Sequence, residues 1–226
     1  LIPFLFAMAI GPRLKWIKSD LKDKISLISL LIISILISFF IVKIFNTNIL
    51  INTILISSAL YLFFITLRDF FSKKYKNFAQ NTAHFGFSLL ILSVLFNNLF
   101  SSEIITNLKV GETYDNSKTK IVFESISQKK EKNYKSIIAN FNITNSEGIN
   151  NNLSPELRIY NQPNITTSEA DIKTTLMKDK FIVINLVQNQ DYFNVRYQVK
   201  PFMLWIWLSV IMISFGGLVS FLQKRI

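Results

Sequence analysis

Residues 25–45 read ISLISLLIISILISFFIVKIF, an apolar run with a single charged residue, Lys43. Roughly 20 helical residues cross a bilayer core about 30 Å thick, and this run has that length and composition. Similar runs follow at 49–67, 82–100 and 202–222, while residues 1–10 are apolar but too short to span. The sequence predicts an α-helical integral membrane protein with four complete transmembrane helices and the end of a truncated one.

The formal charge of +11 is concentrated at the ends of these runs. Basic side chains gather in the loop 11–24, in the loop 68–76 and in the tail 223–226. The positive-inside rule places all three segments in the cytoplasm, so residues 101–200 are predicted to be exported. These residues carry thirteen Lys and Arg against eleven Asp and Glu, whereas a nucleic-acid-binding protein would present a basic face on its soluble fold. We therefore expect membrane lipid, and no nucleic acid, around this chain.

Residues 101–200 are predicted to form a small all-β domain inserted before the last span. Alternating or continuous apolar residues predict strands at 119–127, 137–143, 181–187 and 193–199, with a polar turn at 145–152. Ser168 followed by Asp171 predicts a helix N-terminus, and hence one short helix over 169–176. About 100 residues suffice for a small open barrel or sandwich.

The sole histidine, His84, lies inside the predicted span 82–100. An ionisable residue in a span is rare and usually faces the interior of the helix bundle, and neutral imidazole is a common axial ligand of haem iron. Gly86 and Ala83 are expected to leave room for a flat macrocycle to approach the backbone. A low-spin site would need a second ligand from outside this chain. The alternative is a histidine that packs between helices through a hydrogen bond.

Other residues offer less chemistry. The chain has no cysteine, which excludes disulfides, thiolate catalysis and covalent c-type haem attachment within it. The acidic residues Glu112, Glu124, Glu156 and Glu169 are predicted to be solvated, because no two are spaced as an acid–base dyad. Gly216-Gly217 in the last span is expected to aid helix packing. No catalytic residue is predicted in this chain.

Several sequence blocks occur in an informative order. The third span opens with TAHFGF (82–87), and PELRIY (155–160), SEA (168–170) and YQVKPFMLWIW (197–207) follow. Together they resemble the C-terminal part of the CcmF family, the cytochrome c haem lyase subunit of the multi-protein (system I) cytochrome c maturation machinery. The resemblance covers essentially the whole chain.

This resemblance implies a role in cytochrome c-type biogenesis. His84 would be one axial ligand of the iron of a transmembrane haem b, with the second axial ligand and the haem-handling active-site segment in the N-terminal part of the same lyase. Further implied partners are a haem chaperone, apocytochrome c with its thiol-reducing and chaperone subunits, and quinol as electron donor. The implied location is the bacterial or mitochondrial inner membrane, with residues 101–200 on the periplasmic side.

The predicted topology places His84 within about one turn of the cytoplasmic end of its span, which suits electron transfer across the membrane. A different class of protein remains open at this point. The chain is alternatively a cofactor-free, membrane-anchored periplasmic binding or assembly module, with His84 as a packing residue.

Overall fold

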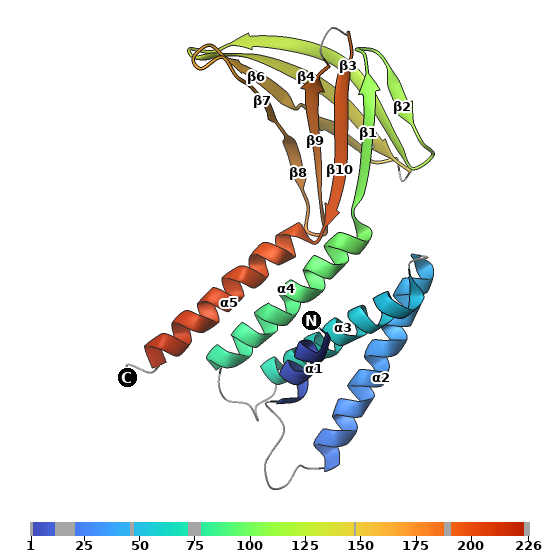
Figure 1. Cartoon of the computed structure of the whole chain (residues 1–226), viewed down its shortest axis with the longest axis vertical. Helices are drawn as coiled ribbons and strands as arrows, with labels where there is room; N and C mark the ends of the chain where they lie inside the picture. Colours follow the sequence, from blue (N-terminus) through green and yellow to red (C-terminus); the bar gives the residue numbers. More distant parts are fainter. Residues whose placement is uncertain are drawn as a thin grey trace. The chain divides into compact units, whose positions relative to one another are not determined.

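The computed structural model describes residues 2–11, 21–45, 48–71, 78–146, 148–187 and 191–223. The chain divides into two compact units, a helical unit (Leu1–Leu99 with Trp205–Ile226) and a β unit (Phe100–Leu204). Figure 1 shows the elements of each unit. The predicted basic loops and the C-terminal tail lie largely outside the described residues.

The helical unit contains long apolar helices, as predicted. Its elements are α1 (Ile2–Ile10), α2 (Leu21–Ile44), α3 (Ile49–Phe71), α4 (Phe78–Phe100) and α5 (Met203–Gln223). All but α1 are long and apolar enough to cross a membrane, which confirms the predicted fold class. Helices α2 and α4 begin four residues before the apolar runs that predicted them, because a helix continues from the hydrocarbon core into the interfacial layer.

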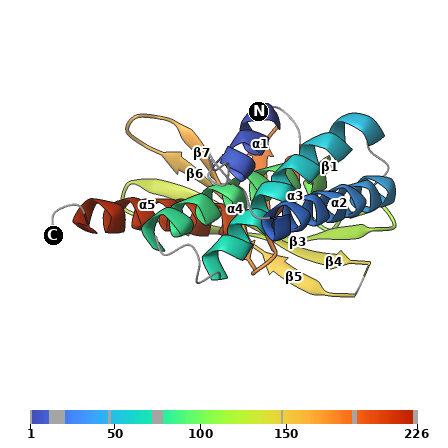
Figure 2. The same ribbon diagram turned by 90° about the horizontal axis from the view of Figure 1, so that it is seen from below.

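Helix α3 is the centre of the helical unit, and both α1 and α2 contact it (Figure 2). Its residues Ile56, Leu62 and Ile65 are buried together with Leu5 of α1 and Val42 of α2. Helix α2 instead exposes many large apolar side chains. An apolar helix surface of this kind is suited to lipid rather than to water.

The β unit is a sandwich of two antiparallel sheets. The four-stranded sheet has the order β1-β10-β9-β8, and the larger sheet has the order β2-β3-β4-β6-β7, with β5 paired to β4. The strands are β1 (Ser102–Leu108), β2 (Thr113–Asp115), β3 (Thr119–Lys130), β4 (Tyr134–Asn145), β5 (Asn150–Leu153), β6 (Glu156–Tyr160), β7 (Thr166–Glu169), β8 (Asp171–Thr174), β9 (Lys178–Leu186) and β10 (Phe193–Pro201). The predicted alternation decides which side chains enter the core, where the rings of Phe123 and Phe141 stack with centroids 4.4 Å apart.

The short helix predicted over 169–176 is wrong. Residues Thr166–Glu169 form β7, and Asp171–Thr174 form β8, which belong to different sheets. The Ser168 hydroxyl donates a 2.6 Å hydrogen bond to the Asn185 side chain instead of capping a helix. Pairing of β-branched residues with β6 and β9 outweighs the local capping signal, because strand propensity depends on the neighbours that a segment packs against.

Candidate functional site

His84 lies on α4 and is half-buried. Two hydrogen bonds between α3 and α4 enclose its position along the helix. One turn before it, the Asn81 amide donates to the backbone carbonyl of Asp69 at 3.3 Å. One turn after it, the Ser88 and Thr66 hydroxyl oxygens lie 2.7 Å apart in the buried interior. Since residues four apart share a helix face, His84 lies on the face of α4 that carries Ser88.

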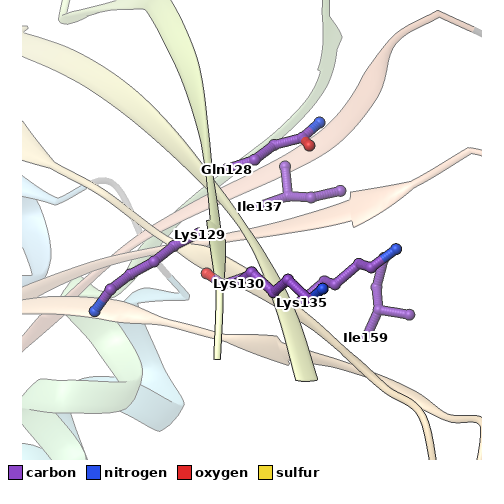
Figure 3. Close-up of a pocket in the computed structure, with 7 residues that line it drawn as sticks. Gln128, Lys129, Lys130, Lys135, Ile137 and Ile159 are labelled. Atoms are coloured by element: carbon purple, nitrogen blue, oxygen red, sulfur yellow. The ribbon is translucent and has the colours of Figure 1, made fainter. Parts of the chain in front are cut away.

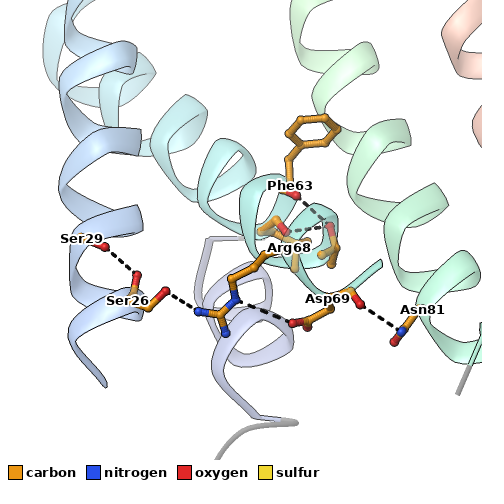
Figure 4. A network of polar contacts seen from close by, with 8 residues as sticks. Ser26, Ser29, Phe63, Arg68, Asp69 and Asn81 are labelled. Carbon is orange, nitrogen blue, oxygen red and sulfur yellow. Dashed lines mark hydrogen bonds and ion pairs between the residues drawn. The ribbon is translucent and has the colours of Figure 1, made fainter. Parts of the chain in front are cut away.

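A polar network joins three helices at the same end of the bundle (Figure 4). The Arg68 guanidinium on α3 donates to the Ser26 hydroxyl on α2, and its Nε atom lies 3.9 Å from the Asp69 carboxylate. Asn81 extends this network to α4. Helix α2 thereby connects to the two helices that position His84.

Aromatic rings surround the same part of α4. The Phe85 ring, next to His84, lies 5.5 Å from the Phe63 ring and 5.7 Å from the Phe70 ring, both on α3. Ring pairs at these centroid distances stabilise packing beyond the area that they bury. They make the surroundings of this part of α4 largely apolar.

The small residues beside His84 have a different role from the one predicted. A methyl carbon added to Gly86 would lie 3.0 Å from the backbone nitrogen of Ile213 and from the carbonyl oxygen of Ser209, both on α5. The same atom added to Gly216 of α5 would lie 2.7 Å from the backbone nitrogen of Ala83. Gly86 and Ala83 therefore admit helix α5, and the expectation that they leave room for a macrocycle is wrong. Gly216 serves helix packing as predicted. A methyl carbon added to Gly217 would meet no atom within 4 Å.

Among the described residues, no three His, Cys, Asp or Glu side chains group as metal ligands. His84 offers one imidazole nitrogen, which is the chemistry of a single axial position of a haem. His84 is six residues from the start of α4, about 9 Å along the axis at 1.5 Å per residue. The helix thus begins before the apolar run, and the expectation that His84 lies within about one turn of the cytoplasmic end of the span stays a prediction.

A second polar cluster lies on the outer face of the larger sheet. We define the Arg158 cluster as Tyr134, Glu156, Arg158, Tyr160 and Glu169. Arg158 donates to the Glu156 carboxylate at 3.1 Å and lies 3.9 Å from that of Glu169, which faces Glu156 across β6 and β7. The Arg158 guanidinium also lies over the Tyr134 ring, 5.2 Å from its centroid.

Sequence reasoning missed this cluster by treating Glu156 and Glu169 as separate solvated residues. The hydrogen bond from Arg158 lowers the pKa of the Glu156 carboxyl below its usual value. A carboxylate kept ionised in this way does not act as a general acid, so the cluster stabilises the sheet rather than forming a catalytic dyad. The signal available in the sequence was the two-residue spacing of Glu156, Arg158 and Tyr160.

The end of the β3–β4 hairpin contains a basic cavity of about 470 Å³ (Figure 3). Lys130 and Lys135 face each other across the two strands, and Ile137 and Ile159 form the apolar part of the lining. Lys129, also part of the lining, forms a 2.7 Å ion pair with Glu131. Both Lys130 and Lys135 are exposed, and none of the described residues that line the cavity is acidic. The arrangement is complementary to an anionic group with an adjoining apolar part.

Transmembrane helices with a β-sandwich inserted before the last span define a multi-pass membrane protein. Residues 99–201 match the family model described as the CcmF C-terminal beta-sandwich. The "Cytochrome c-type biogenesis protein CcmF" of Escherichia coli (strain K12) is 25% identical over 143 residues, which are 63% of this chain and 22% of that protein. The "Cytochrome c-type biogenesis protein ccl1" of Rhodobacter capsulatus is 29% identical over 143 residues, with the same shares of each chain.

A solved structure titled "Cytochrome c Heme Lyase CcmF" has the same fold, with a TM-score of 0.71 and 16% identity, over 96% of this chain and 38% of that chain. The chain thus spans about a fifth of the length of the curated relatives it matches. These matches show that the chain is similar to the C-terminal part of CcmF-type cytochrome c biogenesis proteins.

Proposed function

We propose that this chain is the C-terminal part of a haem lyase subunit that supports covalent attachment of haem to apocytochrome c. In this proposal it provides one axial ligand of a transmembrane b-type haem through His84, and its β unit faces the periplasm of a bacterium or the equivalent side of a mitochondrial inner membrane. The observation that carries the proposal is the half-buried His84 enclosed between two interhelical hydrogen bonds.

A haem bound there would supply a one-electron carrier within the membrane. The residues of this chain would hold and orient His84, the proposed ligand of the haem iron. The Thr66–Ser88 hydrogen bond fixes the rotation of α4 against α3, and the Phe63 and Phe70 rings limit access of water. Because α5 packs against Gly86, that face of α4 does not hold the haem, and His84 is the residue of this helix that would. The second axial ligand would come from the N-terminal part of the same lyase.

Two further partners belong to this proposal. Quinol would donate electrons, and an apolar cavity of about 270 Å³ lined by Leu27, Leu31 and Tyr61 offers a lipid-soluble molecule a place among the helices. The basic cavity of the β unit would receive an acidic segment of a partner in the maturation complex, namely the haem chaperone, apocytochrome c or one of its thiol-reducing and chaperone subunits. Charge complementarity at Lys130 and Lys135 supports this docking.

The deciding experiment is a reduced-minus-oxidised absorption spectrum of the chain purified with its N-terminal part. We expect a b-type signal that His84→Ala abolishes or strongly reduces. Val94→Ala, a substitution at an exposed position of the same helix, is the matched control and should keep the signal. An unchanged spectrum in the His84→Ala protein would remove His84 as a ligand.

One observation favours the alternative of a cofactor-free binding or assembly module. The small residues next to His84 are covered by α5, as they would be if this region of α4 served packing alone. The same spectrum separates the two functions. Absence of a b-type signal in both the unmodified protein and the control, with the protein folded, would favour the module.

A further inference from the structure

The turn between β8 and β9 presents two apolar side chains at its tip. Thr175 and Lys178 close the turn, because the Thr175 N–H donates to the Lys178 carbonyl at 3.1 Å and the Lys178 N–H donates to the Thr175 hydroxyl at 3.2 Å. Between them, Leu176 is 59% exposed and Met177 is 54% exposed. Turn tips usually carry Gly, Asn, Asp, Pro or Ser, so a rigid turn that presents leucine and methionine is unusual in water.

The same turn is tied to the residue at which the chain enters its last span. The Phe202 N–H donates to the Met177 carbonyl at 2.8 Å, and Lys178 pairs with Pro201 in the sheet. Phe202 adopts a φ of 61°, which a bulky side chain rarely adopts and which this hydrogen bond helps to hold. Helix α5 begins at the next residue, Met203. The turn is therefore hydrogen-bonded to the residue that directly precedes α5.

The neighbouring residues have the chemistry of a membrane interface. Trp205 and Trp207 lie in the first turns of α5, where aromatic residues are enriched at the boundary between headgroups and hydrocarbon. On the β unit, Lys178 and Lys200 lie at the ends of β9 and β10 next to the turn. Asp179 pairs with Lys200 across the two strands, and lysine side chains near a lipid surface are attracted to anionic headgroups.

We propose that Leu176 and Met177 insert into the lipid at the boundary between headgroups and acyl chains, and so attach the β unit to the membrane at a point separate from its two chain connections. The occupant of this apolar tip is the bilayer leaflet that α5 enters. Insertion transfers both exposed apolar side chains out of water, which is favourable in proportion to the apolar area removed. The attachment does not depend on haem ligation by His84.

The absence of cysteine makes a direct test available, because each single cysteine substitution creates a unique labelling site. Leu176→Cys, Met177→Cys and Val110→Cys are each labelled with a nitroxide in the full chain, reconstituted in vesicles of phosphatidylethanolamine and phosphatidylglycerol. Val110 is the matched control, since it is also apolar, 50% exposed and in the β unit. Val110 follows the last residue of β1, Leu108. The first residue of β1, Ser102, lies at the opposite end of the strand and pairs with Val199, near the end of β10.

Relaxation of each label is then measured with oxygen, which partitions into lipid, and with a water-soluble nickel chelate. We expect the labels at 176 and 177 to be accessible to oxygen and protected from nickel, and the label at 110 to show the reverse. Nickel accessibility at 176 and 177 equal to that at 110 would overturn the proposal. Protection from both relaxants would indicate burial against protein and would overturn it as well.

Discussion

The hydroxyl oxygens of Thr66 on α3 and Ser88 on α4 lie 2.7 Å apart. Both side chains are also within hydrogen-bond distance of carbonyls in their own helices, Thr66 of Leu62 at 2.9 Å and Ser88 of Phe85 at 2.8 Å. In a membrane interior, where water does not compete, such a pair fixes the rotation of one helix against the other. The direction in which His84 faces follows from this pair.

Replacement of Ser88 by alanine should therefore weaken the contact between α3 and α4. Hydrogen bonds between transmembrane helices contribute about 0.6 kcal/mol on average and up to about 2 kcal/mol, so we expect a loss in that range. The measurement is the unfolding free energy in detergent micelles. Ser29→Ala is the control, because the Ser29 hydroxyl donates only to Ser26 of its own helix. Equal effects of the two substitutions would contradict the interhelical role.

Substitution of Gly216 by alanine should separate α4 from α5. The added methyl carbon would lie 2.7 Å from backbone atoms of Ala79 and Ala83, and backbone atoms cannot move aside as a flexible side chain can. Overpacking of this kind costs roughly 1–3 kcal/mol, measurable as a lower thermal midpoint. Gly217→Ala is the matched control, since nothing lies within 4 Å of the added carbon. A midpoint that falls equally for both variants would argue against a specific contact at Gly216.

The β unit should lose stability in acid through Glu156. The Arg158 hydrogen bond lowers the folded-state pKa of Glu156 below the usual value of 4.5, so this stabilisation is present above that pH and is lost as the pH falls through the folded value. Because the pair is partly exposed, we expect less than about 1 kcal/mol. Scanning calorimetry at neutral and acid pH should show a smaller decrease in midpoint for Arg158→Met than for the unmodified chain. Lys118→Met, at an exposed turn, should retain the full decrease.

Reversal of charge at the basic cavity should weaken partner docking. Lys130→Glu with Lys135→Glu places two carboxylates where the proposed acidic segment would bind, and like charges facing each other are repulsive. Pull-down of the maturation partners should fall at least several-fold, and the loss should be smaller at high salt. Lys118→Glu with Lys120→Glu changes the net charge equally and lies outside the cavity lining, so it should retain binding. Equal binding by both double variants would exclude the cavity as the docking site.

The fold was largely predictable because its main signals are local in the sequence. The length of each apolar run is enough to identify a span, and Ile137, Ala139, Phe141 and Ile143 alternate as a strand with one buried face requires. The segment 169–176 misled because the pairing of β7 and β8 with distant strands is not visible in a local window.

The candidate site was predictable only in part. His84 is conspicuous as the sole histidine of the sequence and lies in a span. The sequence around Gly86, however, does not show which segment packs against this small residue. Gly86 fits a macrocycle or a helix equally well until Ile213 is found against it. The Arg158 cluster required the register that places Glu156 opposite Glu169, and the basic cavity required Lys130 opposite Lys135. The dense run of lysines at 129–135 was the available signal for the cavity.

Strands β1 and β10 are neighbours, and Ser102 at the start of one pairs with Val199 near the end of the other. The chain thus enters and leaves the sandwich through two points about 5 Å apart, the usual separation of paired antiparallel residues. In the helical unit, α4 and α5 are held together independently by Gly86 and Gly216. The sandwich is therefore topologically an insertion into the loop of a helical hairpin. Its surface can change in evolution, or be exchanged by design, without altering the spacing of the two helices that carry it.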